Sequence, residues 1–442
     1  MADIGGRLTK MERDYTEEVD KELPRCKELA ANGHVSEALE QLLSLEKRTR
    51  LSADGASTKR VLVAIVQLCF DTQDWEALNE NVMIMTKRRG QLKMAIQAMV
   101  EQCIKFIDET PDKDTKLKLI STLRTATEGK IYVEVERARL TMELARMKEA
   151  DGEVIEAAKV LQELQVETFG SMKREEKVEF ILEQMRLGLA KQDFIRTQII
   201  SKKVSTKFFT DITSPEVQKL KLKFYQLMVD LGLNSDSFLD ISRHYFAMYE
   251  TPCVQEDRER KTETLCNVIL YCLLAPFDNE QSDMLHRMQK EKLLEDLPLY
   301  KDLVKKFVTQ ELIVWSQFQL TFAPTLREAS RVFTGKPAYW EELRKRVVEH
   351  NIRIIAKYYT KVRLQRLADL LDLPAEDTEE FLSNLVLKKT IFARIDRPDG
   401  VIIFRETKDA SDVLNEWSGS LSSLMTLVSK ATHLIHKEEM VH

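Results

Sequence analysis

The hydrophobic positions of residues 347–404 follow a helix, helix, helix, strand, strand pattern. Three segments carry apolar residues three or four positions apart, the spacing of one face of a helix. These positions are Val348, Ile352, Ile355 and Tyr359, then Leu364, Leu367, Ala368 and Leu371, then Phe381, Leu382, Leu385 and Val386. Two β-rich runs follow, at 391–396 and 401–404, joined by Arg397-Pro398-Asp399-Gly400, which suits a tight turn. Three helices and a two-stranded wing predict a winged helix-turn-helix.

The charges of this module argue against nucleic acid. A DNA-reading helix is expected to be basic, because neutralised phosphates supply most of the affinity. The third predicted helix begins instead with Glu376-Asp377-Thr378-Glu379-Glu380, and ten Lys/Arg balance ten Asp/Glu between Val347 and Glu406. We therefore expect a protein-docking module, with a nucleic-acid-binding winged helix as the alternative of another class.

A weak repeat runs through the first two-thirds of the chain. Residues 31–40, with Gly33, resemble residues 150–159, with Gly152, and both lie between helical patterns. A small residue that would let two helices approach closely recurs at gaps of 39, 80 and 40 residues, at Ala38, Ala77, Ala157 and Thr197. Degenerate copies are expected near Leu117 and Ser237. A period near 40 built from two helices and a turn is typical of an α-solenoid.

The chain is therefore expected to be all-α, with few glycines (13) and prolines (10) to interrupt long helices. We assign residues 1–320 to a right-handed α-solenoid of helix-turn-helix, TPR-like repeats. Pro324, Gly335 and Pro337 predict a linker or variable loop over 321–338. The winged helix would occupy 339–406, and a long C-terminal helix 407–442.

The C-terminal helix carries a narrow apolar seam. Its apolar residues are spaced three, four, three, four, three and four, which is an a/d heptad pattern, at Leu414, Trp417, Leu421, Leu424, Val428, Ala431 and Ile435. Such a seam requires another helix beside it. Two arrangements remain open: the helix folds back on the chain's own solenoid, or it enters a bundle with helices of other chains.

No reactive constellation stands out. P-loop, GxSxG and HExxH motifs are absent, and the six cysteines include no CxxC pair, so we expect no catalytic, cofactor or metal site. His433 and His436 could share a metal only if further ligands joined them, and structural cysteines are the ordinary expectation. Lys87-Arg88-Arg89 suits a helix end, where it complements the dipole.

The composition predicts a soluble intracellular protein. Charged residues make up 31% of the chain and the net charge is −5. The N-terminus lacks an apolar signal region, and no apolar run reaches the ~20 residues that a membrane span needs. Location in both cytoplasm and nucleus is expected, and the sequence does not separate the two.

The layout and several sequence blocks resemble the PCI-domain subunits of the proteasome lid. A helical solenoid that runs into a winged helix is the layout of the PCI family, whose members also serve the COP9 signalosome and a translation initiation complex. The resemblance extends from about residue 10 to the C-terminus. The blocks that carry it are Glu128–Leu140, Leu161–Met172, Phe194–Lys203, Leu274–Asp283 and Val347–Tyr359.

The resemblance implies a non-catalytic scaffold, with the PCI helical part beginning near residue 216. Its partners would be other lid subunits, joined through PCI winged helices and a bundle of C-terminal helices. The lid's metalloprotease deubiquitinase and the base ATPases would be neighbours. Alternating Ile391, Ala393 and Ile395 in the wing would offer a strand edge to a neighbouring PCI domain. An equivalent PCI scaffold of the COP9 signalosome is the alternative.

Overall fold

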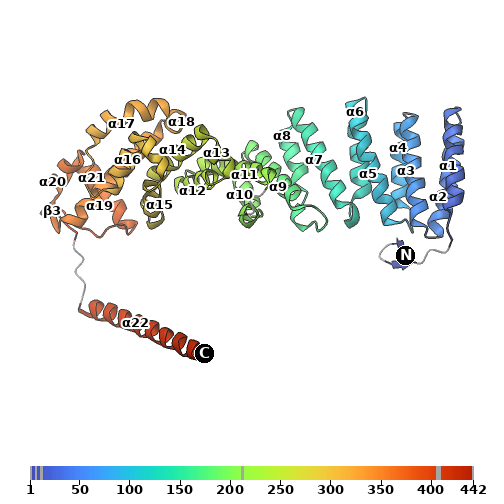
Figure 1. Cartoon of the computed structure of the whole chain (residues 1–442). Coiled ribbons are helices and arrows are strands. Elements are labelled where there is room, and N and C mark those ends of the chain that lie inside the picture. The colour runs from blue at the N-terminus through green and yellow to red at the C-terminus, as the bar shows by residue number, and fades with distance from the viewer. Residues whose placement is uncertain (1, 5–6, 10–12, 211–213, 405–409, 441–442) are drawn as a thin grey trace. The chain divides into compact units, whose positions relative to one another are not determined.

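The structure, a computed structural model, describes residues 2–4, 7–9, 13–210, 214–404 and 410–440. Within these ranges α-helices dominate, and the strands are short, so the predicted all-helical class is confirmed (Figure 1). The chain divides into two compact units, one of Met1–Ser235 with Thr251–Cys253 and one of Asp236–Glu250 with Val254–His442. This division falls inside the segment 1–320 that the sequence analysis assigned to one solenoid.

The first unit is built from helices joined by short turns. A small antiparallel hairpin, β1 (Ala2–Ile4) and β2 (Arg7–Thr9), precedes them, with Ala2 opposite Thr9. The helices are α1 (Thr16–Ala31), α2 (Val35–Leu51), α3 (Gly55–Asp71), α4 (Trp75–Lys87), α5 (Lys93–Glu109), α6 (Lys113–Thr127), α7 (Glu134–Ala150), α8 (Val154–Gln162), α9 (Arg174–Ala190), α10 (Phe194–Ser201) and α11 (Pro215–Ser235), with single 3₁₀ turns at Ile131–Val133, Val166–Thr168 and Thr206–Thr210.

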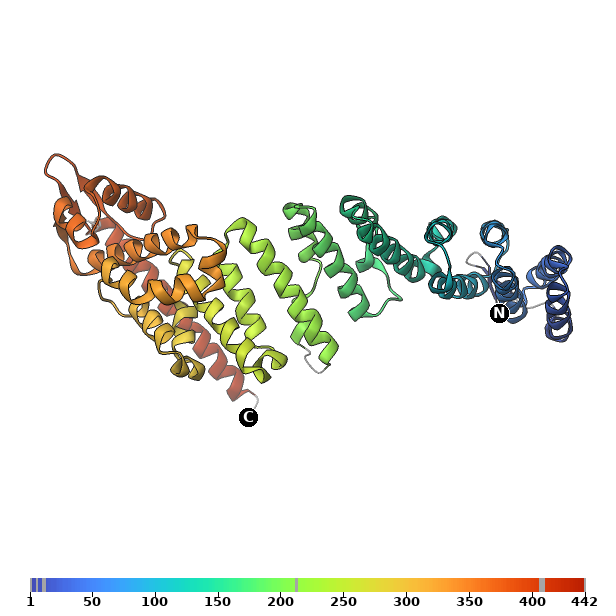
Figure 2. The ribbon, with the colours of Figure 1, turned by 90° about the horizontal axis from the view of Figure 1, so that it is seen from above.

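These helices form the two layers of a solenoid. Helix α3 packs against α1 and α5 in one layer, and α4 packs against α6 in the other (Figures 1 and 2). The core between the layers is continuous from one helix pair to the next, so buried residues of α2 to α7 belong to one cluster. Each pair therefore covers an apolar face that its neighbour cannot cover alone.

The turn inside four of the helix pairs has one hydrogen-bond pattern, which the α2–α3 connection at Ala53 also has. Gly33, Gln73, Gly152 and Gln192, at spacings of 40, 79 and 40, all have positive φ angles. In each turn the next residue's N–H reaches the carbonyl five positions back, as from His34 to Leu29 at 3.1 Å. This is the Schellman ending of a helix, which satisfies carbonyls left free at its C-terminus. The structure thus supports the predicted repeat period, and the α5–α6 connection, where a degenerate copy was expected, lacks the motif.

The small residue of the repeat lies in the first helical turn after this ending. Ala38, Ala157 and Thr197 are fully buried there, whereas Ala77 is half-buried. Helices α9 and α10 approach each other closely at Gly188. A Cβ added to Gly188 would lie 2.5 Å from Thr197 Oγ1. Close packing of the two helices therefore depends on the absence of a side chain at Gly188.

Ion pairs and hydrogen bonds also connect one repeat to the next. Arg186 donates to both oxygens of Glu149, each at 2.6 Å, and to Glu183 at 2.7 Å. Lys223 bonds the other side of Glu183. These partners on neighbouring repeats are 37 and 40 residues apart, close to the repeat period. The two cations hold the pKa of the Glu183 carboxyl below its usual range against the opposing effect of its burial, which is the largest single influence.

The chain after residue 235 continues as helices and ends in a small sheet and a long helix. The elements are α12 (Phe238–Tyr249), α13 (Pro252–Glu256), α14 (Arg258–Leu274), α15 (Asn279–Gln289), a 3₁₀ turn (Lys292–Asp296), α16 (Pro298–Val308), α17 (Trp315–Ala329), α18 (Arg331–Gly335), α19 (Ala338–Tyr358), β3 (Lys361–Arg363), α20 (Leu364–Leu371), α21 (Ala375–Leu387), β4 (Arg394–Asp396), β5 (Val401–Ile403) and α22 (Ala410–Glu439).

The linker or loop expected over 321–338 is mostly helical instead. Helix α17 runs through Pro324, and α18 follows almost at once. Pro324 is exposed, whereas Phe318, Phe322 and Leu326 on the opposite side of α17 are buried. Burial of three large side chains offsets the single backbone hydrogen bond that proline removes. The sequence analysis treated Pro324 as a helix breaker, and this interpretation is wrong because α17 continues through it.

The winged helix forms as predicted, with one additional strand. Its helices are α19, α20 and α21, and its core includes Ile352, Leu367, Leu382 and Ile402. The sheet has three strands in the order β3-β5-β4, so β3 and β4 are both edges. Strand β3 is as short as β4 and β5, and two of its three residues are charged, so it does not stand out as a β-rich run in the sequence. The predicted turn is confirmed: Gly400 has a φ of +61° and its N–H bonds the Arg397 carbonyl at 3.2 Å.

We expect Gly188→Ala to destabilise the first unit by about 1–3 kcal/mol, because the new methyl group overpacks the contact with Thr197. Urea unfolding of the full chain followed by circular dichroism measures this. Gly55→Ala is the control, since nothing lies within 4 Å of a Cβ there. Adding Thr197→Ala to Gly188→Ala should recover part of the loss. Additive losses in the double variant would show that the two side chains do not conflict.

The depressed pKa of Glu183 makes part of the stability depend on pH. A carboxyl whose pKa is lower in the folded state contributes stability that is present above its unfolded pKa near 4.5 and lost as the pH falls through the folded value. We expect Glu183→Gln to lower stability at pH 7 by about 1–2 kcal/mol. The difference from wild type should shrink as the pH falls below 4.5. A difference that does not change with pH would contradict the ion-pair explanation.

Candidate protein-docking surfaces

The C-terminal helix presents an uncovered apolar face. Helix α22 contains 30 residues, about 45 Å at 1.5 Å per residue, and none of them is buried. The predicted seam lies on it with six large residues between 46% and 65% exposed: Leu414, Trp417, Leu421, Leu424, Val428 and Ile435. Ala431, the seventh seam position, is also exposed. The helix thus carries its predicted seam as an exposed apolar face, which either of the two arrangements would cover.

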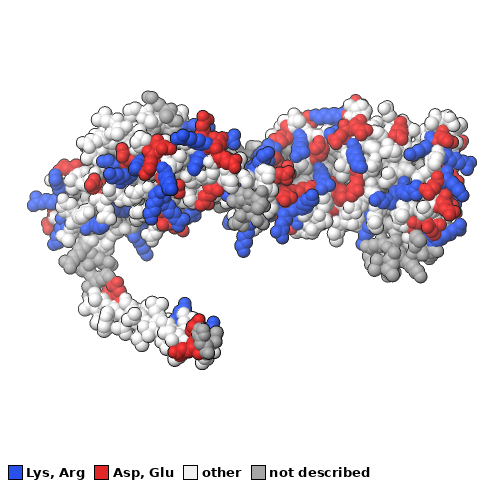
Figure 3. All heavy atoms as spheres, viewed as in Figure 1, with Lys and Arg blue, Asp and Glu red and all other residues white. Residues whose placement is uncertain are grey.

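This face is wider than the predicted seam. Val413, Leu427 and Leu434, fourteen and seven residues apart beside it, are also at least half exposed, and so is Met425 on the other flank. The three residues Val413, Leu427 and Leu434 share a second heptad position in the sequence, and the prediction of the seam did not include that position. From Trp417 to Ser429 the helix contains no charged residue, and Figure 3 shows it largely white between charged groups near its ends. A face this wide suits contact with more than one helix.

The wing has an edge strand as predicted, but the three apolar residues expected to lie along it are not fully exposed. Ile391, Ala393 and Ile395 are half-buried and pack on the core of the winged helix. Only Ile395 lies within β4. Their side chains are thus engaged internally, and Phe392, between them, is the exposed one, at 44%. What β4 offers to a partner is its free backbone edge, because β5 pairs with its other side.

The acidic residues predicted at the start of the third helix lie in the first turns of α21, mostly at the surface. Glu376, Asp377 and Glu380 are exposed on α21. Glu379 accepts hydrogen bonds from Arg397 of the wing at 2.7 and 2.8 Å. A cation that could have reached a phosphate is therefore neutralised within the module. The surface that reads DNA in other winged helices is acidic here.

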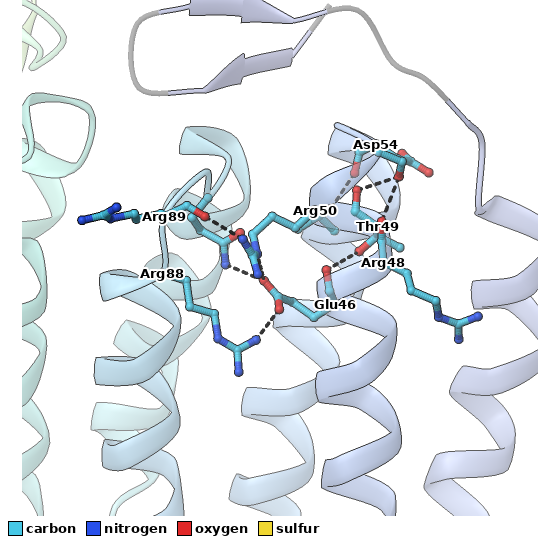
Figure 4. A network of polar contacts seen from close by, with 10 residues as sticks. Glu46, Arg48, Thr49, Arg50, Asp54, Arg88 and Arg89 are labelled. Atoms are coloured by element: carbon cyan, nitrogen blue, oxygen red, sulfur yellow. Dashed lines mark hydrogen bonds and ion pairs between the residues drawn. The ribbon is translucent and has the colours of Figure 1, made fainter.

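The basic cluster at the end of α4 is structural in part. Arg88 forms an ion pair with Glu46, a fully buried carboxylate of α2. Glu46 also accepts from Arg50 Nε at 3.0 Å and from Gln91 at 3.1 Å, and Arg50 bonds the Arg89 carbonyl at 2.6 Å (Figure 4). The cluster thus joins two successive helix pairs through one buried charge.

Four of the six cysteines are buried packing residues, whereas Cys266 is half-buried and Cys253 is exposed. Cys69, Cys103 and Cys272 are buried, and desolvation raises the thiol pKa to about 11 for Cys69 and about 12 for the other two. Such thiols are protonated at neutral pH and poorly nucleophilic. Among the described residues no group of three or more His, Cys, Asp or Glu could hold a metal ion. His436 lies 3.2 Å from Glu439 on α22.

The helices of the described ranges include none with the length and hydrophobicity to cross a membrane.

Three family descriptions match successive parts of the chain. Residues 37–257 match "PSMD12/CSN4, N-terminal", and residues 285–406 match "PCI domain". Residues 411–442 match "26S proteasome regulatory subunit RPN5 C-terminal domain". The third match covers α22, and its description names the proteasome alone. The first description names both PSMD12 and CSN4, so the third match is the one that favours the proteasome over the COP9 signalosome.

Curated relatives agree over nearly the whole chain. The 26S proteasome non-ATPase regulatory subunit 12 of Dictyostelium discoideum is 43% identical over 98% of this chain and 96% of its own length. The chain belongs to this family of PCI-domain proteasome regulatory subunits. The Saccharomyces cerevisiae regulatory subunit RPN5 is 39% identical over 98% of this chain and 97% of its own length. Homolog A of subunit 12 from Arabidopsis thaliana is 40% identical over 93% of this chain and 98% of its own length.

We expect Glu46→Ala to destabilise this member of the family by roughly 3–5 kcal/mol, because it leaves two partly buried arginines without their shared carboxylate. Urea unfolding of the full chain measures the loss. Glu40→Ala on the exposed side of α2 is the matched control and should change stability by no more than about 0.5 kcal/mol. A loss no larger than that of the control would show that the network contributes little.

Proposed function

We propose that this chain is a non-catalytic scaffold subunit of the lid of the proteasome regulatory particle. In this role it is needed for lid assembly and so for ubiquitin-dependent protein degradation. The observation that carries the proposal is α22, which presents an uncovered apolar face over the residues that match the RPN5 C-terminal domain. Family membership and the shape of the PCI module support it.

Each part has a distinct task in this proposal. The solenoid of residues 1–320 provides the helical arm, and the winged helix of 339–406 joins neighbouring lid subunits through the β4 edge. The helix of 407–442 enters a bundle with the C-terminal helices of other subunits. The lid's metalloprotease deubiquitinase and the base ATPases are neighbours, and the chain works in the cytoplasm and the nucleus.

The energetics of α22 support assembly as the purpose of its face. Burying one leucine side chain contributes about 1.5–3 kcal/mol, and the face offers many residues of that size. An isolated chain leaves all of that free energy unused. A bundle recovers it, so the helix links the stability of the assembly to the presence of this subunit.

Affinity purification of the tagged full-length chain, beside a version that ends at Thr407, tests the proposal. We expect lid and ATPase subunits with the full chain, identified by mass spectrometry, and their depletion with the truncated one. Recovery of signalosome subunits would move the assignment to that complex. Recovery of the chain with nucleic acid and no protein partner would overturn the docking interpretation of the winged helix.

Charged residues in the seam provide a sharper test. We expect Leu421→Asp with Leu424→Asp to leave the isolated chain folded, since neither side chain is buried in it, and to reduce co-purified lid subunits by at least about tenfold. Ser423→Asp with Thr426→Asp, at the same spacing on the opposite side of α22, is the matched control. Unfolding of the isolated seam variant would instead place the seam in the chain's own core.

A further inference from the structure

A basic pocket in the second unit has no role in the helix or wing contacts described above. It lies between α15, α16 and α19 and has a volume of about 240 Å³. Its apolar walls include Phe277, Leu285 and Phe307, while its ionisable lining consists of His286, His350, Arg353 and Lys357. No Asp or Glu side chain is among the described residues that line it. The pocket therefore has cationic groups without an anion.

Arg353 is the central cation of the pocket. Its guanidinium carbon lies 3.5 Å from the centroid of the Phe277 ring, and its Nη2 lies 3.4 Å from His350 Nδ1. Its Nε is buried without a hydrogen-bond partner, and no described carboxylate lies within 4 Å of the group. Burial lowers the Arg353 pKa to about 10, opposed only by the more distant Glu349. The group remains charged at neutral pH, so an unpaired cation is held against an aromatic ring.

The nearest acidic residue is already engaged. Glu349 accepts a hydrogen bond at 2.5 Å from Arg346, and it also lies 3.8 Å from Lys388. Arg346 pairs in addition with Glu342. Two of the arginines on α19 thus differ: Arg346 has two carboxylates and Arg353 has none. Because a half-buried cation without a counter-charge is less stable than a paired one, the difference indicates a partner that the isolated chain does not supply.

His350 contributes a second polar group to the pocket. It is 4% exposed, and burial, reinforced by Arg353, lowers its pKa to about 4, so the ring is neutral at pH 7. Nδ1 accepts from Arg353, which leaves the proton on Nε2. The Glu311 backbone lies near the ring, but Nε2 makes no hydrogen bond of normal geometry with any described residue. Lys357, one helical turn after Arg353, is exposed and contacts Gln310.

We propose that this pocket receives the carboxylate of an Asp or Glu side chain from a neighbouring protein subunit. The inference rests on the proposed scaffold function, which brings other subunits against this chain. A planar guanidinium binds a carboxylate through two parallel hydrogen bonds, and Lys357 adds a second charge at one turn's distance. The small volume suits one side chain, since pockets for whole small molecules are usually larger, roughly 300–1,000 Å³.

Zero-length carbodiimide coupling tests this in the complex purified through the tagged full-length chain. The reagent joins a lysine amine to a carboxylate only when the two are in contact. We expect mass spectrometry to find Lys357 joined to an Asp or Glu of another subunit. Arg353→Gln should lower the yield of that link at least fivefold, whereas Arg344→Gln, elsewhere on α19 and outside the pocket, should leave it unchanged.

The outcomes separate the two proposals. A complex that contains other subunits but shows no link from Lys357 to another chain would overturn the carboxylate pocket and leave the scaffold function standing. A link that Arg353→Gln does not weaken would also overturn it. Protection of Lys357 by inorganic phosphate, without a link to protein, would reassign the pocket to a small anion. Absence of any co-purified subunit would overturn both proposals. The wild-type link needs no variant, so misfolding of Arg353→Gln would not obscure the result.

Discussion

Close approach of the two helices in each pair determines how the first unit is built. The second helix begins with a small, mostly buried residue at Ala38, Ala77, Ala157 and Thr197. The preceding helix ends in a left-handed turn that reverses the chain within a few residues. Together these features fix how closely the two helices of one pair pack against each other. A bulky residue at either place would separate the layers, and the continuous core would lose its contacts.

Ion pairs between neighbouring helix pairs also stabilise this stacking, and they show which charged groups find a counter-charge within the chain. Glu46 and Glu183 each receive cations from a neighbouring helix pair, so the charged groups inside the solenoid find their partners within the chain. Arg353 differs, since it is half-buried on an aromatic ring and has no acidic partner among the described residues. Helix α22 also differs, because its large apolar side chains are exposed and not buried in the described structure. At both places the described chain leaves an interaction unmade, as expected of a subunit whose partners are other proteins.

Much of the architecture could be predicted because it depends on local periodicity. The three helices of the winged helix, its Pro-Asp-Gly turn, the repeat period near 40 and the heptad seam of α22 are all patterns of neighbouring residues. The prediction was wrong at 321–338, where burial of Phe318, Phe322 and Leu326 keeps a helix intact around Pro324. It missed β3, whose three residues are a strand only because β5 lies beside them.

The sequence by itself determined the all-helical class, the repeat and the apolar face of α22, because spacing along one helix decides which side chains share a face. Only the tertiary structure decided what each side chain meets. It turned Ile391 and Ala393 toward the core of the winged helix, assigned Arg88 to a carboxylate 42 residues away, and left Arg353 without one. Those outcomes depend on contacts between residues far apart in the chain, and periodicity carries no information about them.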